Sequence, residues 1–137
     1  MLLKNGANID IEDTRGNGLT PFHHAIVLNN PKMVSLLLEN GADVNKMFPE
    51  ILPFFYAKTP LHEVIQLYST SYRRTQKELD NFLEIISILL KKDNSDLHKG
   101  NRIGNTPLHD AAQRDLKEIM CLLFENNVDV NMKNNLG

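Results

Sequence analysis

One part of the chain shows a short apolar stripe between clear helix boundaries. In residues 30–41, apolar residues recur at three- and four-residue intervals and share one helical face: Met33, Val34, Leu37 and Leu38. Asn30 precedes the stripe as a capping residue, and Pro31 fits the first helical position, where no N–H is needed. Gly41 follows as a left-handed terminator. The pattern predicts an amphipathic helix with one buried face.

Two further segments carry another helix-start signal. Thr75 and Glu78 have the three-residue spacing of a capping box, in which each side chain bonds the other's backbone N–H. We therefore predict a helix over residues 76–92. Asp115 and Glu118 have the same spacing ahead of the apolar run IMCLLF, and they predict another capped helix.

A shorter helix is predicted ahead of each of these segments, at a Thr-Pro pair. The threonine hydroxyl caps the helix and the proline opens it; the pairs are Thr20 with Pro21, Thr59 with Pro60, and Thr106 with Pro107. The residues that begin the buried stripes are Phe22, Leu61 and Leu108. Asn29 or Asp115 is expected in the left-handed conformation at the following turn. After the long helix that position falls to Asp93 or Asn94, at a higher cost than glycine.

Two motifs alternate along the chain and pair these helices. One reads TPFHHA at 20–25, TPLHEV at 59–64 and TPLHDA at 106–111; the other reads GANID at 6–10, GADVN at 41–45 and NVDVN at 127–131. Thr20 and Asn45 have the same separation as Thr106 and Asn131. These motifs resemble the ankyrin repeat. The resemblance covers essentially the whole chain and implies an all-α solenoid of stacked helix-turn-helix pairs with hairpin-like loops.

The motif spacing predicts one array with an enlarged middle repeat. The Thr-Pro motifs are more than 33 residues apart, which is the usual ankyrin period. The extra residues fall in 46–58 and in 60–105, mostly around 68–81. Val64 and Ile65 replace two small alanines of the family pattern, which predicts looser packing there. The predicted units are a partial repeat over 1–10, repeats over 11–45, 46–98 and 99–131, and the start of a further repeat over 132–137, as expected for a piece of a longer array.

Composition narrows the classes of partner. A net charge of −2 and a pI near 6.2 argue against nucleic acid, which requires a strongly basic face. No apolar run approaches the length of a membrane span, and the opening MLLKN becomes polar too early for a signal peptide. Cys121 has no partner for a disulfide within the chain. This favours a reducing compartment, the cytoplasm or that of a host cell if the source is viral or bacterial.

Residue types that perform catalysis are present but not arranged for it. The sequence contains no Ser–His–Asp group, catalytic carboxylate pair or phosphate loop. His23, His62 and His109 recur with the repeat, without a cysteine or carboxylate at ligand spacing. The resemblance implies that they bond backbone or threonine groups and join neighbouring turns. Cys121 is expected to pack as a small hydrophobe, so we expect no catalytic, metal or cofactor site.

The resemblance also assigns a role to the asparagines that end the second motif. It implies that Asn45 and Asn131 stabilise their turns by bonding the backbone. Hydroxylation of such an asparagine is a minor alternative.

The segment KMFPEILPFFYAK, residues 46–58, concentrates aromatic residues at a predicted hairpin. Two interpretations stay open. In one, Phe48, Phe54, Phe55 and Tyr56 form an exposed patch that anchors a partner. In the other, which solubility favours, the strip folds back over the enlarged repeat, and each buried aromatic contributes about 1.5–3 kcal/mol.

The resemblance implies a binding module that presents a rigid concave surface of hairpins and first helices to a protein partner. By position in the motif, the candidate contact residues are Leu19, His24, Val27, Lys58, Glu63, Gln66, Asn105, Asp110 and Gln113, with Phe54, Phe55 and Tyr56 of the aromatic strip. Nucleic acid, membrane and small-molecule substrates are not expected. Two alternatives stay open: a targeting segment of a longer enzyme or effector with its catalytic domain outside this chain, and an internal spacer.

Overall fold

A computed structural model describes residues 8–13, 15, 18–49, 58–70, 73–93 and 95–135. Its helices form three pairs: α1 (Pro21–Val27) with α2 (Pro31–Glu39), α3 (Pro60–Ser69) with α4 (Gln76–Lys92), and α5 (Pro107–Gln113) with α6 (Lys117–Glu125). A 3-10 helix, η2 (Ser95–His98), precedes the third pair. Over these ranges the only β-pairing is one antiparallel bridge between Phe48 and Lys58. The predicted all-α solenoid is confirmed.

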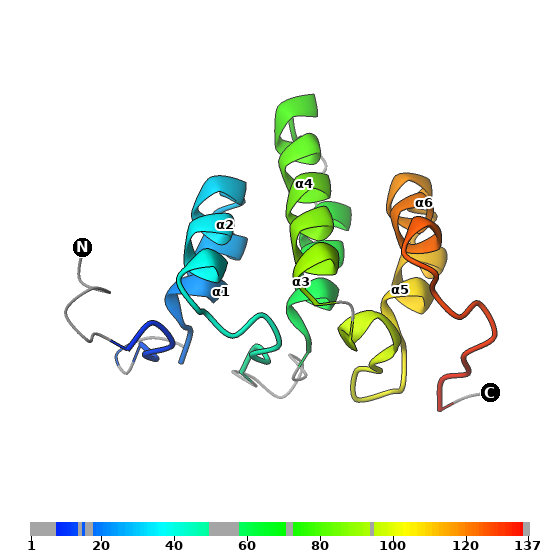
Figure 1. Ribbon diagram of the computed structural model, residues 1–137. Coiled ribbons are helices and arrows are strands. Elements are labelled where there is room, and N and C mark those ends of the chain that lie inside the picture. The colour runs from blue at the N-terminus through cyan, green and yellow to red at the C-terminus, as the bar shows by residue number, and fades with distance from the viewer. Residues whose placement is uncertain are drawn as a thin grey trace.

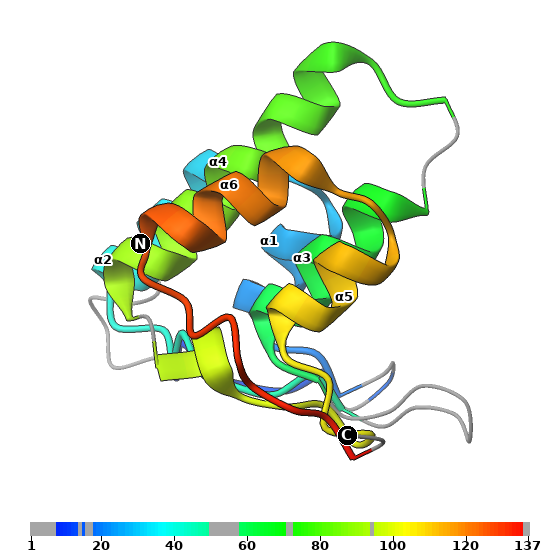
Figure 2. The ribbon, with the colours of Figure 1, turned by 90° about the vertical axis from the view of Figure 1, so that its right-hand side faces the viewer.

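The three pairs stand side by side in a row that follows the sequence (Figure 1). Viewed along the row, α1, α3 and α5 form one layer and α2, α4 and α6 the other (Figure 2). Contacts run within each pair and between successive pairs, first helix to first helix and second to second. The pairs therefore share one continuous core.

The three Thr-Pro pairs start helices as predicted. Each threonine has an extended backbone, and its Oγ1 accepts a hydrogen bond from the backbone N–H three residues later; the bonds are His23 to Thr20, His62 to Thr59, and His109 to Thr106. Asn29 and Asp115 both adopt a left-handed φ of 54° in the turns. Gly41 ends the second helix of the first pair with a φ of 94°. Capping is satisfied by residues close in sequence, which is why it could be predicted.

One predicted capping box is present and another is not. Thr75 and Glu78 bond each other's backbone N–H groups at 2.7 and 3.2 Å, and α4 begins at Gln76 as predicted. The predicted box of Asp115 and Glu118 is wrong: the N-cap of α6 is Leu116, which makes no side-chain cap bond. Asp115 already occupies the left-handed turn position, so it stands one residue too early to cap the helix.

The structure also differs from two expectations about packing, and it tests part of one about backbone conformation. Asp93 has a φ of −161°, which is extended rather than left-handed; Asn94 lies outside the described residues. Val64 and Ile65 do not loosen the middle pair, because both are fully buried and fill the interior between the layers. Met33 was expected in a buried stripe, yet it is 43% exposed, while Val34, Leu37 and Leu38 are buried.

The middle pair is enlarged mainly by longer helices. Its second helix, α4, has 17 residues, whereas α2 and α6 have 9 each. The beginning of α4 projects beyond its neighbours (Figure 1), by about 12 Å at the usual helical rise. The guanidinium of Arg74 lies 4.5 Å from the centre of the Phe82 ring in this projection. Among the described residues no helix, α4 included, combines the length and the apolar character that crossing a membrane requires.

Candidate functional site

Two of the recurring histidines, His23 and His62, connect neighbouring pairs through the backbone. His62 is buried, and its Nε2 lies 2.8 Å from the carbonyl oxygen of Asn105, just before the next pair. A carbonyl only accepts, so Nε2 carries the proton and Nδ1 accepts from the Thr59 hydroxyl at 2.7 Å. His23 repeats this arrangement, with Nε2 2.9 Å from the Lys46 carbonyl. The geometry therefore agrees with the structural role that the family resemblance implies for these histidines.

The same geometry disfavours the charged form of His23. Burial lowers the pKa of its imidazole below the ordinary 6.5, and the hydrogen bond to the Lys46 carbonyl offsets only part of that effect. Nδ1 accepts the backbone N–H of Thr20 at 3.2 Å. A proton on Nδ1 would set two donors against each other, so the charged form also loses this bond.

Nine candidate contact residues occupy three equivalent positions on the three pairs, and we call this set the first-helix face. The position before the capping threonine is held by Leu19, Lys58 and Asn105. The other two positions lie on α1, α3 and α5, held by His24, Glu63 and Asp110, and by Val27, Gln66 and Gln113. The face changes in chemistry from one pair to the next.

In the first pair the face is open and largely apolar. His24 is exposed, Val27 is 44% exposed, and Leu19 is half-buried against the core. At the adjoining hairpin the ammonium of Lys46 lies 3.0 Å from the Glu12 carboxylate, and that contact raises the pKa of Lys46. This end of the face can accept an apolar group.

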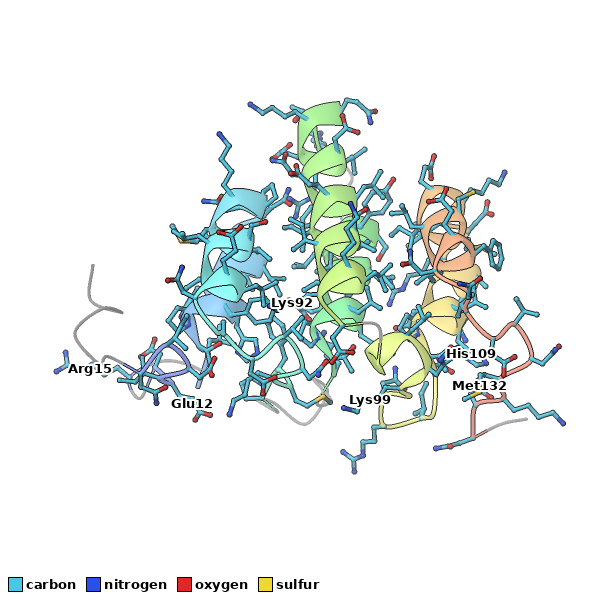
Figure 3. The ribbon with its side chains drawn as sticks, viewed as in Figure 1. Glu12, Arg15, Lys92, Lys99, His109 and Met132 are labelled. Atoms are coloured by element: carbon cyan, nitrogen blue, oxygen red, sulfur yellow. The ribbon has the colours of Figure 1, made fainter. Side chains whose placement is uncertain are left out.

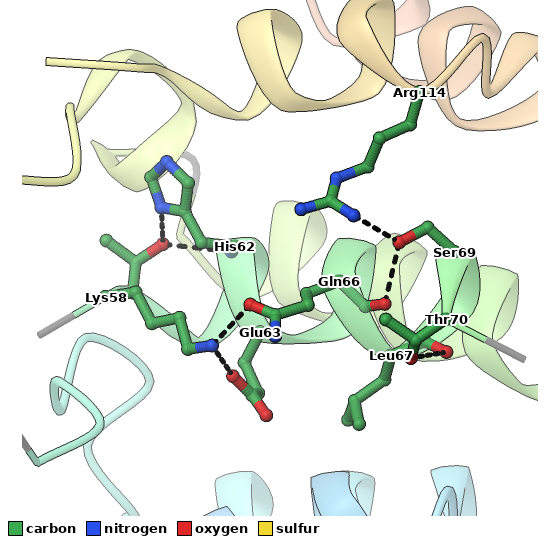
Figure 4. A network of polar contacts seen from close by, with 9 residues as sticks. Lys58, His62, Glu63, Gln66, Leu67, Ser69, Thr70 and Arg114 are labelled. Atoms are coloured by element: carbon green, nitrogen blue, oxygen red, sulfur yellow. Dashed lines mark hydrogen bonds and ion pairs between the residues drawn. The ribbon is translucent and has the colours of Figure 1, made fainter. Parts of the chain in front are cut away.

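In the middle pair the face closes on itself. The Lys58 ammonium lies 2.6 Å from a Glu63 carboxylate oxygen and donates to Oε1 of Gln66 at 2.6 Å (Figure 4). The Lys58 and Glu63 side chains are only 15% and 13% exposed. The structure thus brings three predicted contact residues together instead of pointing them separately outward. The charges of Lys58 and Glu63 neutralise each other, and Gln66 accepts a hydrogen bond from the same ammonium.

In the third pair the face is polar and anionic. Asn105 was expected to face outward and does not: it is 2% exposed, and its Oδ1 accepts from Asn134 at 2.7 Å. Its Nδ2 approaches Asp110 and Gln113 at 3.5 and 3.4 Å. No cation pairs with the Asp110 carboxylate in the part of the chain that the structure describes. Asp110 and Gln113 remain available to hydrogen-bond donors.

The aromatic strip is described only at its edges. Phe54, Phe55 and Tyr56 lie outside the described residues, so their role stays a prediction. Phe48 is 5% exposed, with its ring 4.2 Å from that of His23. This residue belongs to the core and not to an exposed patch.

Cys121 and the turn asparagines differ from expectation. The Cys121 side chain is exposed, because Ile119 and Leu123 take the inward positions of α6. In the turns, it is the carboxylates of Asp43 and Asp129 that accept the backbone N–H groups of Asn45 and Asn131, both at 2.9 Å. Nδ2 of Asn45 donates to the Asp93 carboxylate at 2.9 Å. The described residues include no cluster of three or more metal-ligating side chains.

Sequence patterns gave no sign of the contacts that tie the enlarged pair to its neighbours. Nδ2 of Asn29 donates to the Glu78 carbonyl at 2.8 Å. On the other side, Nη1 of Arg114 donates to the Ser69 hydroxyl at 2.9 Å (Figure 4). These partners lie 49 and 45 residues apart in the chain, and no spacing rule relates them.

Comparison with known proteins matches this architecture to a family. A model described as "Ankyrin repeats (3 copies)" matches residues 1–72 and 78–134. Putative ankyrin repeat protein FPV219 of fowlpox virus is 31% identical over 129 residues, covering 85% of this chain and 30% of that protein. Phosphocholine transferase AnkX of Legionella pneumophila is 31% identical over 140 residues, covering 93% and 13%. Human ankyrin repeat and SOCS box protein 6 is 46% identical over 46 residues, covering 34% and 11%. The chain thus spans less than a third of each of these relatives.

Proposed function

The chain belongs to the ankyrin repeat family, and from that premise we propose that it binds a partner protein through the first-helix face. Ankyrin repeats are protein-interaction modules, and stacking holds their contact residues in a fixed row. Fixed residues lose little conformational entropy on association. The observation that carries the proposal is the alignment of equivalent positions on α1, α3 and α5, each pair anchored by a threonine cap.

The chemistry of the face suggests what the partner presents. Leu19 and Val27 offer apolar contact at one end, and Asp110 and Gln113 offer acceptors at the other. Between them, Lys58 and Glu63 form an ion pair at hydrogen-bonding distance, so their opposite charges already compensate each other. A partner segment with an apolar anchor at one end and N–H donors at the other fits this order. Net attraction by charge contributes little, because only one carboxylate of the face is uncompensated.

The test is capture of partners from a lysate of the source cell by the immobilised chain. The test variant carries Val27→Glu and Gln113→Glu, at two exposed positions of the face. The control carries Lys77→Gln and Lys117→Gln, which change the charge by the same two units on the second helices. We expect the test variant to lose partners that the control retains, with both circular dichroism spectra unchanged. Equal capture by both variants refutes the face. Absence of any partner favours the spacer.

A second candidate function is favoured by one relative. The match to phosphocholine transferase AnkX covers 13% of that protein, so this kind of array occurs within an enzyme of much greater length. In this second candidate function, the array directs a longer enzyme or effector to its target. Sequencing the transcript on both sides of residues 1–137 decides the matter: an adjoining catalytic domain supports the targeting role, and stop codons flanking this chain exclude it.

We propose no catalysis by these residues themselves. The family is generally non-enzymatic, and the recurring histidines are occupied by structural hydrogen bonds in the first two pairs. The unpaired Cys121 is compatible with a protein that functions in a reducing compartment, such as the cytoplasm. Imaging of a tagged chain in the source or host cell tests this location, and accumulation in an oxidising compartment contradicts it.

A further inference from the structure

Four loops of the array share one short pattern, and one of them carries a histidine. The pattern is an Asn or Asp, then an apolar residue, then a polar residue; it reads NID at 8–10, DVN at 43–45, DLH at 96–98 and DVN at 129–131. In three loops the first side chain accepts the backbone N–H of the third residue; these side chains are Asn8, Asp43 and Asp129. His98 therefore occupies the third position, which elsewhere holds an Asp or an Asn.

This third position joins one loop to the next. Oδ1 of Asp10 accepts the backbone N–H of Asp43 at 3.1 Å. Nε2 of His98 accepts the backbone N–H of Asp129 at 2.7 Å. In both cases the donor is the first residue of the pattern in the following loop. The array thus makes the same joint twice, with a carboxylate as acceptor at Asp10 and an imidazole at His98.

The two acceptors differ in how they respond to acid. An imidazole nitrogen accepts a hydrogen bond when the ring is neutral, and in the charged ring both nitrogens are donors. A proton on Nε2 of His98 would face the N–H of Asp129, so the bond is lost. Histidine ordinarily changes its charge between pH 5 and 8, whereas a carboxylate ordinarily keeps its acceptor oxygens over that range.

The charged groups around this joint are few. They are Lys92 and Asp93 at the end of α4, Asp96 on η2, Lys99 and Arg102 after it, Asp110 on α5, and Asp129 and Lys133 on the last loop. A second histidine, His109 of α5, lines a hollow together with Asp129. Figure 3 labels Lys92, Lys99 and His109. Any test must therefore distinguish protonation of His98 from protonation of His109.

The geometry points to His98 as a pH-sensitive joint between the middle and third pairs. With a neutral ring, His98 holds the loop over residues 127–131 against η2. Protonation of the ring releases the N–H of Asp129 to water and frees this loop. The release is local, because His98 and Asp129 are both exposed while α5 and α6 stay packed through the core. The joint at Asp10 stays closed over the same pH range.

Nuclear magnetic resonance between pH 7.5 and 5.5 tests this inference on the isotope-labelled chain. The ring protons of His98 report its charge, and the backbone N–H of Asp129 reports the joint. We expect the Asp129 amide proton to shift with the same midpoint as the His98 ring. Its exchange with water, corrected for the intrinsic effect of pH, should accelerate by about 2- to 12-fold, the factor for one net hydrogen bond. The N–H of Asp43 is the internal control and should show neither change.

His98→Asn is the matched variant, because Asn occupies the equivalent positions 45 and 131. Its side chain does not titrate, and position 98 is exposed, so the circular dichroism spectrum should be unchanged. We expect the Asp129 N–H of this variant to show no transition. An Asp129 N–H that stays constant in the wild type while the His98 ring titrates overturns the inference. A transition that persists in His98→Asn also overturns it, because His109 or another group would then be its source.

Discussion

The hydrogen bond between pairs gives the sharpest prediction for stability. His62→Ala removes a buried imidazole whose Nε2 bonds the Asn105 carbonyl and whose Nδ1 bonds the Thr59 hydroxyl. His109→Ala is its internal control, because His109 makes the same contacts with its own threonine but reaches no carbonyl among the described residues. The difference between the two variants isolates the junction between pairs.

The magnitude follows from burial. Asn105 is 2% exposed, so its carbonyl has little access to bulk water when the imidazole is removed. A buried acceptor left unsatisfied costs about 1–3 kcal/mol. His62 is 1% exposed and His109 is half-buried, so lost packing enlarges the difference in the same direction. We therefore expect His62→Ala to reduce the free energy of unfolding by at least about 1–3 kcal/mol more than His109→Ala.

Urea denaturation followed by circular dichroism at 222 nm measures both variants. The comparison is valid if the slopes against urea agree, because the slope reports the surface exposed on unfolding. Equal losses from the two substitutions refute the reasoning. A larger loss from His109→Ala does so as well, since it would place the more important histidine at the open end.

The remaining predictions concern pH, capping and thiol exposure. Burial holds the pKa of His23 below 6.5 in the fold, so the unfolded chain binds its proton first as pH falls. Stability from this group is therefore complete above pH 6.5 and declines below it; urea midpoints at pH 7.5 and 5.5 should differ, and equal midpoints contradict this. Thr75→Ala removes both bonds of a capping box and should cost about 1 kcal/mol, with faster hydrogen exchange at the start of α4; unchanged exchange there argues against the box. Exposed Cys121 should take up one thiol label without denaturant, and protection until unfolding would show it to be buried.

Local rules predicted the helix starts well. Each threonine cap bonds a backbone N–H only three residues away, so the pattern and the contact lie in the same short stretch. The error at Asp115 has the same local origin. Spacing alone allows this residue both a left-handed turn and an N-cap, and it cannot satisfy both.

Exposure was harder to predict, because it depends on the neighbouring pair. Helical periodicity places Met33 beside buried residues, yet Met33 is 43% exposed, whereas the equivalent Ile85 and Ile119 are fully buried. Cys121 lies in an apolar run, yet Ile119 and Leu123 take the inward side of the helix. The periodicity of one helix does not indicate which neighbouring element, if any, packs against a given side of it.

The candidate face was predicted in position but not in its internal contacts. Glu63 and Gln66 share a face of α3 through their three-residue spacing. Lys58 lies before the helix, and only the loop conformation brings its ammonium within 2.6 Å of both side chains. Burial of Asn105 likewise depends on Asn134, 29 residues away. Motif position therefore identifies equivalent positions on the three pairs, whereas the charge pattern of the candidate face depends on the folded loops.

Photo-crosslinking in the source cell tests the proposed binding face most directly. A photoreactive amino acid replaces Gln113 on α5, and in a separate protein it replaces Glu125 on α6; both positions are exposed on the same pair. We expect a covalent adduct with one partner protein from position 113 and none from position 125. Adducts from position 125 alone, or equally from both, would contradict binding through the first-helix face.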